Sequence, residues 1–164
     1  TVASASAMLT WVFFDRLNGR KVSALGACIG AVVGLVVITP SAGFVTIPQS
    51  MFFGFIGAIV SNKMVYWKKL KQIDDTLDVF ACHGVGGIMG MILTAIFAQG
   101  ENASLLHGGF SVFGHHMIAL VLVSIFTFGG SYLLFKLTNI IIPIRVSEES
   151  ETIGLDLSQH GEKF

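Results

Sequence analysis

The sequence predicts an all-α fold, a polytopic transmembrane helix bundle, and three observations support this prediction. First, 53% of the 164 residues are hydrophobic and 12% are charged, which is about half the charged share of an ordinary soluble domain. Second, the mean hydropathy is +0.77. Third, the apolar residues fall in long runs that short polar connectors separate. This share of charged residues is too small for a surface that is exposed to water. We therefore expect lipid to surround the bundle.

Five apolar runs are expected to span the membrane: residues 1–14, 23–38, 47–66, 79–98 and 116–137. A spanning helix needs about 20 residues, which the last three runs provide. The second run reaches this length if it begins near Val22 or includes Thr39, and the first run is short. Because the chain opens in helix-like sequence without an initiator Met, we expect a fragment or a processed product.

The basic residues predict the orientation of the chain. The four connectors are residues 15–21, 39–46, 68–78 and 99–114. Lys and Arg occur in the first and third connectors and in the tail, and they are absent from the second and fourth. Cytoplasmic connectors are enriched in Lys and Arg. We therefore expect a multi-pass membrane region over residues 1–144, which starts outside the cell, and a cytoplasmic tail over residues 145–164.

Glycines recur at helical spacing in two of these runs. Every fourth residue from Gly26 to Gly34 is a glycine, and Gly86 and Gly90 repeat this spacing in the fourth run. Small residues allow membrane helices to approach closely, so tight packing is one expected role. For Gly86 and its neighbour Gly87, the wall of a narrow pore is the alternative role.

His83 is an ionisable residue well inside the fourth run. Ionisable groups at membrane depth are costly, so they usually face the bundle interior and belong to a pathway or a proton relay. The structural alternative is a core histidine that a backbone carbonyl satisfies. In apolar surroundings a neutral imidazole is favoured, with one donor and one acceptor. It suits a small neutral hydrogen-bonding solute or a proton. On a regular helix, one face would carry Val79, His83, Gly86, Gly87, Gly90 and Thr94.

Acidic residues precede this run at its expected cytoplasmic end. Asp75 and Asp78 have the spacing of a helix N-cap and the third helical position, where carboxylates accept hydrogen bonds from free N–H groups and complement the helix dipole. Helix capping is the role we predict for both residues. A place at the mouth of a channel is the alternative for Asp78.

Several classes of function find no support in the sequence. The net charge is zero, so there is no electrostatic argument for nucleic-acid binding. No nucleophile–base pair, phosphate-binding loop or metal-ligand spacing is present, and we predict no enzyme activity, no cofactor and no metal site. Cys28 and Cys82 lie in apolar runs and are expected to be buried free thiols rather than a disulfide or a metal pair.

Four stretches of the chain resemble the Amt/Mep family of ammonium transporters. DDTLDVFACHGVGG is similar to the family signature, in which an Asp-rich helix start is followed by DVF, two residues and HGVGG. LGACIGAVVGLVVITPSAGFV resembles the glycine-striped span with its exit loop, and TVASASAMLTWVFFDRLNGRK resembles the span before it. RVSEESETIGLDLSQHGEKF resembles the cytoplasmic end with its GLD and HGE motifs. The related Rhesus proteins typically carry HGMPG around the histidine and resemble the chain less.

The resemblance implies that the chain corresponds to spans seven to eleven of an eleven-span inverted-repeat fold, about twice as long, that assembles as a homotrimer. His83 then matches one of two pore histidines, and Val79 matches a hydrophobic residue at the cytoplasmic end of the pore. The partner histidine, and most of the aromatic gate and outer recruitment site, would belong to the first six spans. The implied function is a channel for nitrogen uptake. Ammonium loses its proton outside, crosses the hydrophobic pore and recovers a proton inside the cell.

The tail is expected to be regulatory. Its polar composition favours disorder, whereas the match to the family motifs favours an ordered cytoplasmic region. The resemblance implies that the tail contacts neighbouring subunits and a trimeric regulator of the PII type. The residues that carry this expectation are Gly154, Leu155, Asp156, His160, Gly161 and Glu162.

Two other functions are compatible with the same sequence. A sensor of this fold would report ammonium to a signalling partner, and a kinase or cyclase domain after Phe164 in the full gene would favour it. A membrane scaffold that kept only the fold is the third possibility. Because a scaffold has no need of an imidazole at the depth of His83, we favour transport.

Overall fold

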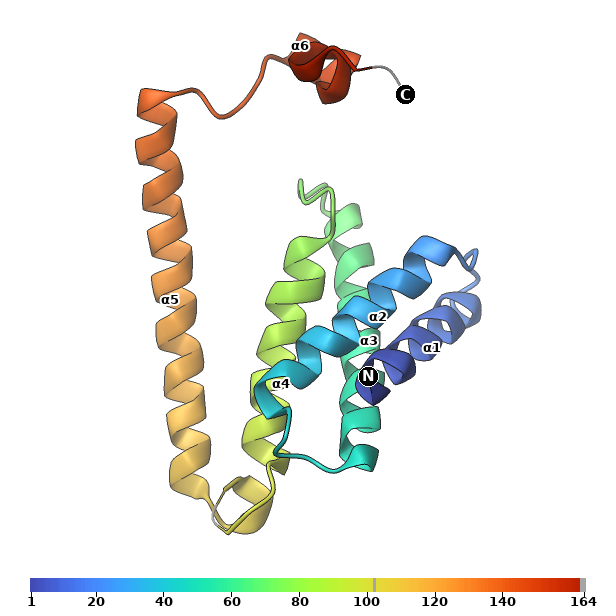
Figure 1. Cartoon of the computed structure of the whole chain (residues 1–164), viewed down its shortest axis with the longest axis vertical. Helices are drawn as coiled ribbons and strands as arrows, with labels where there is room; N and C mark the ends of the chain where they lie inside the picture. Colours follow the sequence, from blue (N-terminus) through green and yellow to red (C-terminus); the bar gives the residue numbers. More distant parts are fainter. Residues whose placement is uncertain (102, 163–164) are drawn as a thin grey trace. The chain divides into compact units, whose positions relative to one another are not determined.

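The computed structural model describes residues 1–101 and 103–162, and all regular structure within these ranges is helical. Figure 1 shows the helices in chain order. The long helices are α1 (Val2–Leu17), α2 (Ala24–Ile38), α3 (Ile47–Leu70), α4 (Val85–Phe97) and α5 (Phe110–Ile141). The short ones are η1 (Thr39–Ser41), η2 (Phe80–Gly84), η3 (Leu105–His107), α6 (Glu148–Ile153) and η4 (Asp156–His160). The predicted all-α class is confirmed, although the last two residues of the expected tail lie outside the described residues.

The chain forms two compact units, residues 1–120 and 121–164. In the first unit, α1 packs against both α2 and α3, and α4 packs against the same two helices (Figure 1). The second unit contains most of α5 together with α6 and η4. The expected tail begins within the second unit, because Arg145 follows the end of α5 at Ile141.

Among the described residues, three helical segments are long and apolar enough to cross a membrane by length and composition, namely Ala24–Ser41, Phe80–Phe97 and Phe110–Ile141. They correspond to the second, fourth and fifth predicted spans. The helix α1 has 16 residues and is shorter than a span requires. The helix α3 has 24 residues, but polar side chains such as Asn62 and Lys68 interrupt its apolar sequence.

The last long helix begins earlier than the sequence indicated. We expected a span from residue 116, whereas α5 begins at Phe110. The turn before it explains this early start, because Gly108 has a φ of 80°, in the left-handed region that glycine adopts readily. The N–H of Phe113 already donates to the Gly109 carbonyl oxygen at 2.9 Å. His116, the first residue of the expected span, therefore lies in the second turn of α5.

Local sequence explains where α2 and α3 begin. The Ser23 hydroxyl accepts a hydrogen bond from the N–H of Gly26 at 3.0 Å. At the start of α3, Thr46 and Gln49 form a reciprocal capping box, in which the Gln49 side-chain oxygen accepts from the N–H of Thr46 at 2.8 Å. Pro48 fits the first turn because it needs no hydrogen-bond partner for a missing N–H. These contacts satisfy N–H groups that have no partner within the helix.

Glycines permit close contact between α1 and its neighbours. A Cβ on Gly30 would lie 2.7 Å from the Cβ of Trp11, and a Cβ on Gly34 or Gly54 would overlap the backbone of Ala3. No larger residue fits at this separation. The glycine stripe of α2 therefore serves helix packing.

A buried polar cluster joins the end of α1 to α3. The Asp15 side chain is 6% exposed, and its Oδ1 accepts from Asn62 Nδ2 at 3.0 Å and from the Tyr66 hydroxyl at 3.4 Å. Arg20 lies 3.4 Å from the same oxygen and donates to Asn62 Oδ1 at 2.8 Å. The Arg20 guanidinium also lies over the Tyr66 ring, 3.2 Å from its centroid. The charge of Asp15 is thus paired and hydrogen-bonded, as a buried carboxylate requires.

Candidate functional site

His83 lies in η2, a turn of π-helix that leads into α4. The N–H of Val85 donates to the Phe80 carbonyl oxygen, which is the wide spacing of a π-turn. Ala81 and Cys82 are buried within this turn, while His83 is exposed. Single π-turns are uncommon and occur frequently at functional sites. Here the turn directs the imidazole away from the packed side of the helix.

The other side of α4 is packed against α2. A Cβ on Gly86 would lie 3.3 Å from Val36 Cγ1, and a Cβ on Gly90 would overlap the carbonyl oxygen of Val37. Gly86 and Gly90 are buried, as is Thr94. The structure therefore places Gly86 in a helix–helix contact, and its role in a pore wall stays a prediction.

Gly87 belongs to the exposed side. A Cβ added there would meet nothing within 4 Å. Val79 is 52% exposed and lies one residue before the π-turn, and His83 is exposed within it. The six residues expected on one helical face are thus divided between a packed side, which carries Gly86, Gly90 and Thr94, and an open side. The open side carries Val79, His83 and Gly87.

Asp75 holds the start of this helix. Its Oδ1 accepts from the N–H of Val79 at 2.9 Å, and its Oδ2 accepts from the N–H of Phe80 at 3.1 Å. The helix begins at Val79, so Asp75 lies four residues before it and not at the N-cap position that the spacing indicated. Asp78 stands directly before the helix with a φ of 55°.

Asp75 and Asp78 both form ion pairs with Lys68. The sequence did not identify Lys68 as a functional residue. The Lys68 side chain is 4% exposed, and its Nζ lies 3.1 Å from Asp75 Oδ2 and 2.6 Å from Asp78 Oδ1. It also donates to the backbone carbonyl oxygen of Asp75. A usable signal did exist, because Lys68 continues the three- and four-residue spacing of Ser61 and Val65 on the buried face of α3.

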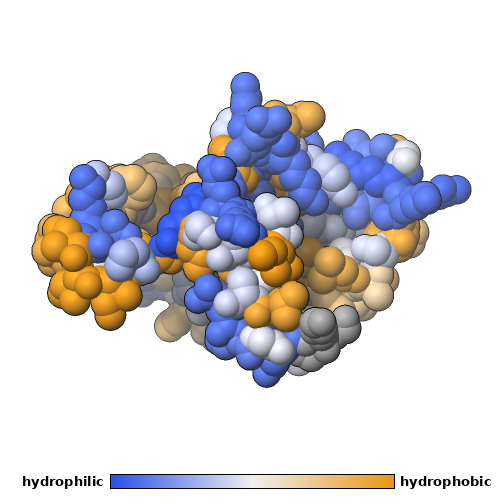
Figure 2. All heavy atoms as spheres, turned by 90° about the horizontal axis from the view of Figure 1, so that it is seen from above, coloured by the Kyte–Doolittle hydropathy of each residue, from blue (hydrophilic) through white to orange (hydrophobic). Residues whose placement is uncertain are grey.

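Opposing effects act on the carboxyl group of Asp75. Its burial raises the pKa, but the Lys68 ammonium and the N–H donors of Val79 and Phe80 outweigh this effect and hold the pKa below its ordinary value. Asp75 is therefore a carboxylate at neutral pH. Figure 2, which views the molecule from above, shows hydrophilic residues on the surface beside hydrophobic ones.

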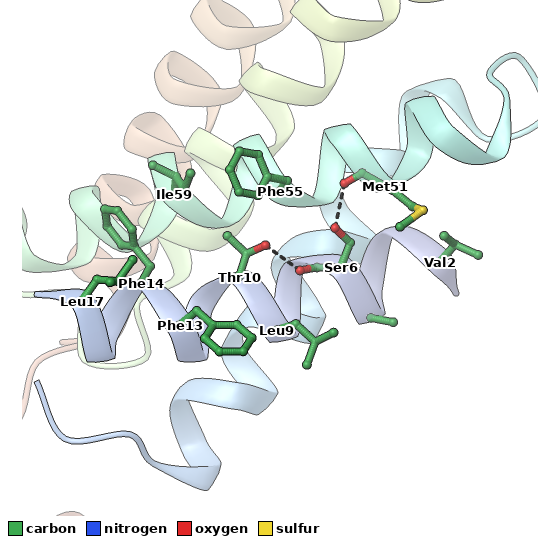
Figure 3. Close-up of a pocket in the computed structure, with 11 residues that line it drawn as sticks. Val2, Ser6, Leu9, Thr10, Phe13, Phe14, Leu17, Met51, Phe55 and Ile59 are labelled. Atoms are coloured by element: carbon green, nitrogen blue, oxygen red, sulfur yellow. Dashed lines mark hydrogen bonds between the residues drawn. The ribbon is translucent and has the colours of Figure 1, made fainter.

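An apolar groove of about 650 Å³ runs along α1 and α3 (Figure 3). Its two hydroxyl groups are both engaged with backbone, since Ser6 donates to the Met51 carbonyl oxygen at 2.8 Å and Thr10 donates to that of Ser6 at 2.7 Å. Both hydroxyl hydrogens of the groove are thus already used within the protein. Its lining comprises Val2, Ala5, Ser6, Leu9, Thr10, Phe13, Phe14, Leu17, Met51, Phe55 and Ile59.

The tail contains two short helical segments. Ser147 accepts from the N–H of Ser150 at 3.3 Å and caps α6. Arg145 donates to the Glu151 carboxylate from Nε at 2.9 Å and from Nη2 at 3.2 Å, and these bonds lower the pKa of Glu151. Described residues of the tail thus adopt local order despite their polar composition.

The two motifs of the tail lie at the ends of these segments. Gly154 ends α6 with a φ of 100°, and Leu155 precedes η4, which runs from Asp156 to His160. Gly161 follows with a φ of 70°, and the N–H of Glu162 donates to the Asp156 carbonyl oxygen at 3.0 Å. The GLD and HGE motifs therefore enclose one turn. Across the described residues of the whole chain, no three His, Cys, Asp or Glu side chains are grouped so as to hold a metal ion.

The chain is similar to known proteins over most of its length. Residues 1–164 match the sequence model of the Ammonium Transporter Family. The ammonium transporter of Bacillus subtilis (strain 168) is 38% identical over 167 residues, which are 98% of this chain and 41% of that protein. The crystal structure of Candida albicans Mep2 has a TM-score of 0.83 and 34% identity, over 96% of this chain and 37% of that one. A solved structure named Sensor Amt Protein has a TM-score of 0.82 and 29% identity, over 96% and 40%. The chain thus spans about two-fifths of the length of the relatives it matches.

Proposed function

This chain belongs to the ammonium transporter family, and we propose on that premise that it supplies the C-terminal half of a membrane subunit that conducts ammonium or ammonia. The observation that supports the proposal most directly is the open side of the fourth span. His83 and Val79 are exposed there beside Gly87, which has free space at its Cα. This side would face the remaining half of the protein and form one wall of the pathway.

The chemistry of this wall suits a small hydrogen-bonding solute. His83 is the single acidic or basic residue of the segment Phe80–Phe97, so no carboxylate is present there to hold a permanent cation. A neutral imidazole can accept a hydrogen bond from ammonia on one nitrogen and donate from the other. In the proposed mechanism, ammonium loses its proton at the outer face and ammonia passes the imidazole. The proton crosses separately and rejoins ammonia inside the cell.

The proposal extends to orientation and assembly. We place the C-terminal tail in the cytoplasm, because the connectors on the same side of the membrane carry the Lys and Arg residues. A homotrimer, and a PII-type regulator at the tail, are partners that the family resemblance suggests. The ordered turns around Gly154 and Gly161 offer such a partner a defined surface.

The test uses the complete protein that contains this chain, expressed in a yeast strain without ammonium transport. Growth on low ammonium and charge movement in reconstituted membranes are measured for the wild type and for His83→Ala. We expect wild-type growth, and a loss or change of charge movement in His83→Ala. His115→Ala is the matched control, because His115 is exposed near the start of α5. Wild-type behaviour of His83→Ala would remove the imidazole from the mechanism.

A sensor is the second candidate function, and the likeness to the structure named Sensor Amt Protein favours it. A sensor would bind ammonium and pass the signal to a partner without supporting growth. A well-expressed complete protein that fails to restore growth, followed in the reading frame by a kinase or cyclase domain, would place sensing ahead of transport.

A further inference from the structure

The buried cation Lys68 is not part of the proposed pathway, yet its contacts lead to His83. A charged side chain that is 4% exposed must be compensated, and Lys68 has two carboxylates at 3.1 and 2.6 Å and one backbone carbonyl as partners. Both carboxylates and the carbonyl belong to the connector between α3 and α4. Lys68 therefore links the end of α3, through ion pairs and a hydrogen bond, to the connector that precedes α4.

One of these carboxylates continues the connection into the π-turn. Asp75 Oδ2 lies between Lys68 Nζ and the N–H of Phe80, the first residue of the turn, while Oδ1 accepts from Val79. A π-turn is less favourable than a regular α-helical turn, so contacts from outside the helix must hold it in place. Asp75 holds its first residue, three residues before His83.

The backbone of the connector also depends on this ion pair. Gln72 and Asp78 have φ values of 53° and 55°, in the left-handed region that non-glycine residues seldom adopt. Lys68 contacts Asp78 directly. Without the ammonium group, two carboxylates would face each other and the connector would lose the contact that opposes this conformational cost.

We propose that Lys68 is a positioning residue, which acts through Asp75 to set the register of the π-turn and hence the direction in which the His83 side chain leaves that turn. The inference rests on the proposed function in one respect, namely that His83 lines the pathway. Downstream of the turn, Gly86 and Gly90 are held by their own contact with α2. The effect of Lys68 should thus be confined to the residues before Gly86.

The geometric test uses thiol labelling of the complete protein in membranes. Single cysteines are placed at positions 81, 83 and 87 in a background with Cys28→Ser and Cys82→Ala, and the labelling rates are compared with and without Lys68→Met. Ala81 is buried, whereas His83 is exposed and Gly87 has free space around it. We expect Lys68→Met to change the labelling rates at positions 81 and 83 and to leave the rate at position 87 unchanged.

A matched control and a mutant cycle separate this role from general stability. Lys69→Met removes the same charge from the next residue of α3, where the side chain is exposed, and should leave all three rates unchanged. Asp75→Asn keeps two polar atoms but loses the ion pair. If Lys68 acts through Asp75, the effects of Lys68→Met and Asp75→Asn on position 83 will not add in the double variant. Additive effects would overturn the proposal, as would equal changes at positions 83 and 87.

Transport by the same variants then connects geometry to function. With the wild-type cysteines and His83 in place, Lys68→Met and Asp75→Asn should lower the maximal rate of ammonium flux at an unchanged half-saturating concentration, whereas Lys69→Met should match the wild type. If the wild type carries no flux, the proposed function fails, and the labelling pattern still decides whether Lys68 sets the turn. If the flux is normal in Lys68→Met while labelling at 83 changes, the link to transport is refuted.

Discussion

The carboxylate of Asp75 accepts two backbone N–H groups and one ammonium group at a connector that leads into the fourth span. These donors favour the charged form, and they hold the pKa below the ordinary value of 3.8 although burial acts in the opposite direction. A carboxyl group whose pKa is lower in the folded state stabilises that state fully above its unfolded pKa. The stabilisation is lost as the pH falls through the lower, native value.

Acidification should therefore remove a stabilising contribution from the wild type that the Asp75→Asn variant, which has no carboxyl group at this position, does not have to lose. Thermal unfolding of the complete protein in detergent is measured from pH 7 to pH 3. We expect the difference in unfolding temperature between the wild type and Asp75→Asn to be constant at neutral pH and to shrink below about pH 4. A difference that stays constant down to pH 3 would contradict the lowered pKa.

Substitution by alanine is expected to have opposite effects on stability at two glycines of α4. A Cβ on Gly90 would overlap the Val37 carbonyl oxygen, so Gly90→Ala should destabilise the bundle by roughly 1–3 kcal/mol. A Cβ on Gly87 meets nothing within 4 Å, and alanine is the better helix former, so Gly87→Ala should leave stability unchanged or raise it by up to about 1 kcal/mol. Chemical denaturation of both variants in detergent provides the comparison. Equal losses would show that packing does not distinguish the two sides of α4.

At the scale of elements, α1 depends on α3 through the cluster around Asp15. Asn62 donates to Asp15 Oδ1 at 3.0 Å and accepts from Arg20 at 2.8 Å. The truncation Asn62→Ala would leave a buried carboxylate with weaker partners, and we expect a loss of about 2 kcal/mol in the free energy of unfolding. Hydrogen exchange should report the change first in α1, because Asp15 and its contacts secure the end of that helix.

The exposed Lys63 serves as the control for this experiment. It lies next to Asn62 on α3, and its Nζ is 6.0 Å from the centroid of the Phe14 ring. Lys63→Ala removes a charge and a longer side chain from the same turn. Exchange in α1 should stay as in the wild type, and accelerated exchange in α1 in both variants would show that the effect is not specific to the cluster.

At the scale of the whole molecule, the proposed pathway is incomplete within residues 1–164. The chain covers 41% of the length of its Bacillus subtilis relative, and Val79, His83 and Gly87 are open where a pore wall would need an opposing surface. We therefore expect residues 1–164 alone, reconstituted in liposomes, to carry no ammonium flux above that of empty liposomes. Flux from this chain alone would require a pathway within these residues or between copies of them.

The sequence by itself determined the fold class, because hydrophobicity and its periodicity are local properties of the chain. The order of the helices and the caps at Ser23 and Thr46 follow from neighbouring residues, and the DVFACHGVGG motif indicated the family and the place of His83. Helix limits were less accurate where a turn decided them. Gly108 starts α5 six residues earlier than hydropathy indicated.

Only the tertiary structure decided which residues share a surface around His83. The assignment of Gly86 to packing and of Gly87 to the open side depends on Val36 and Val37, some 50 residues away in the chain. The ion pairs of Lys68 depend on how the connector folds back onto α3. Sequence spacing assumes a regular helix, whereas a π-turn held by contacts from another helix breaks that regularity, so the register of His83 is a property of the packed bundle.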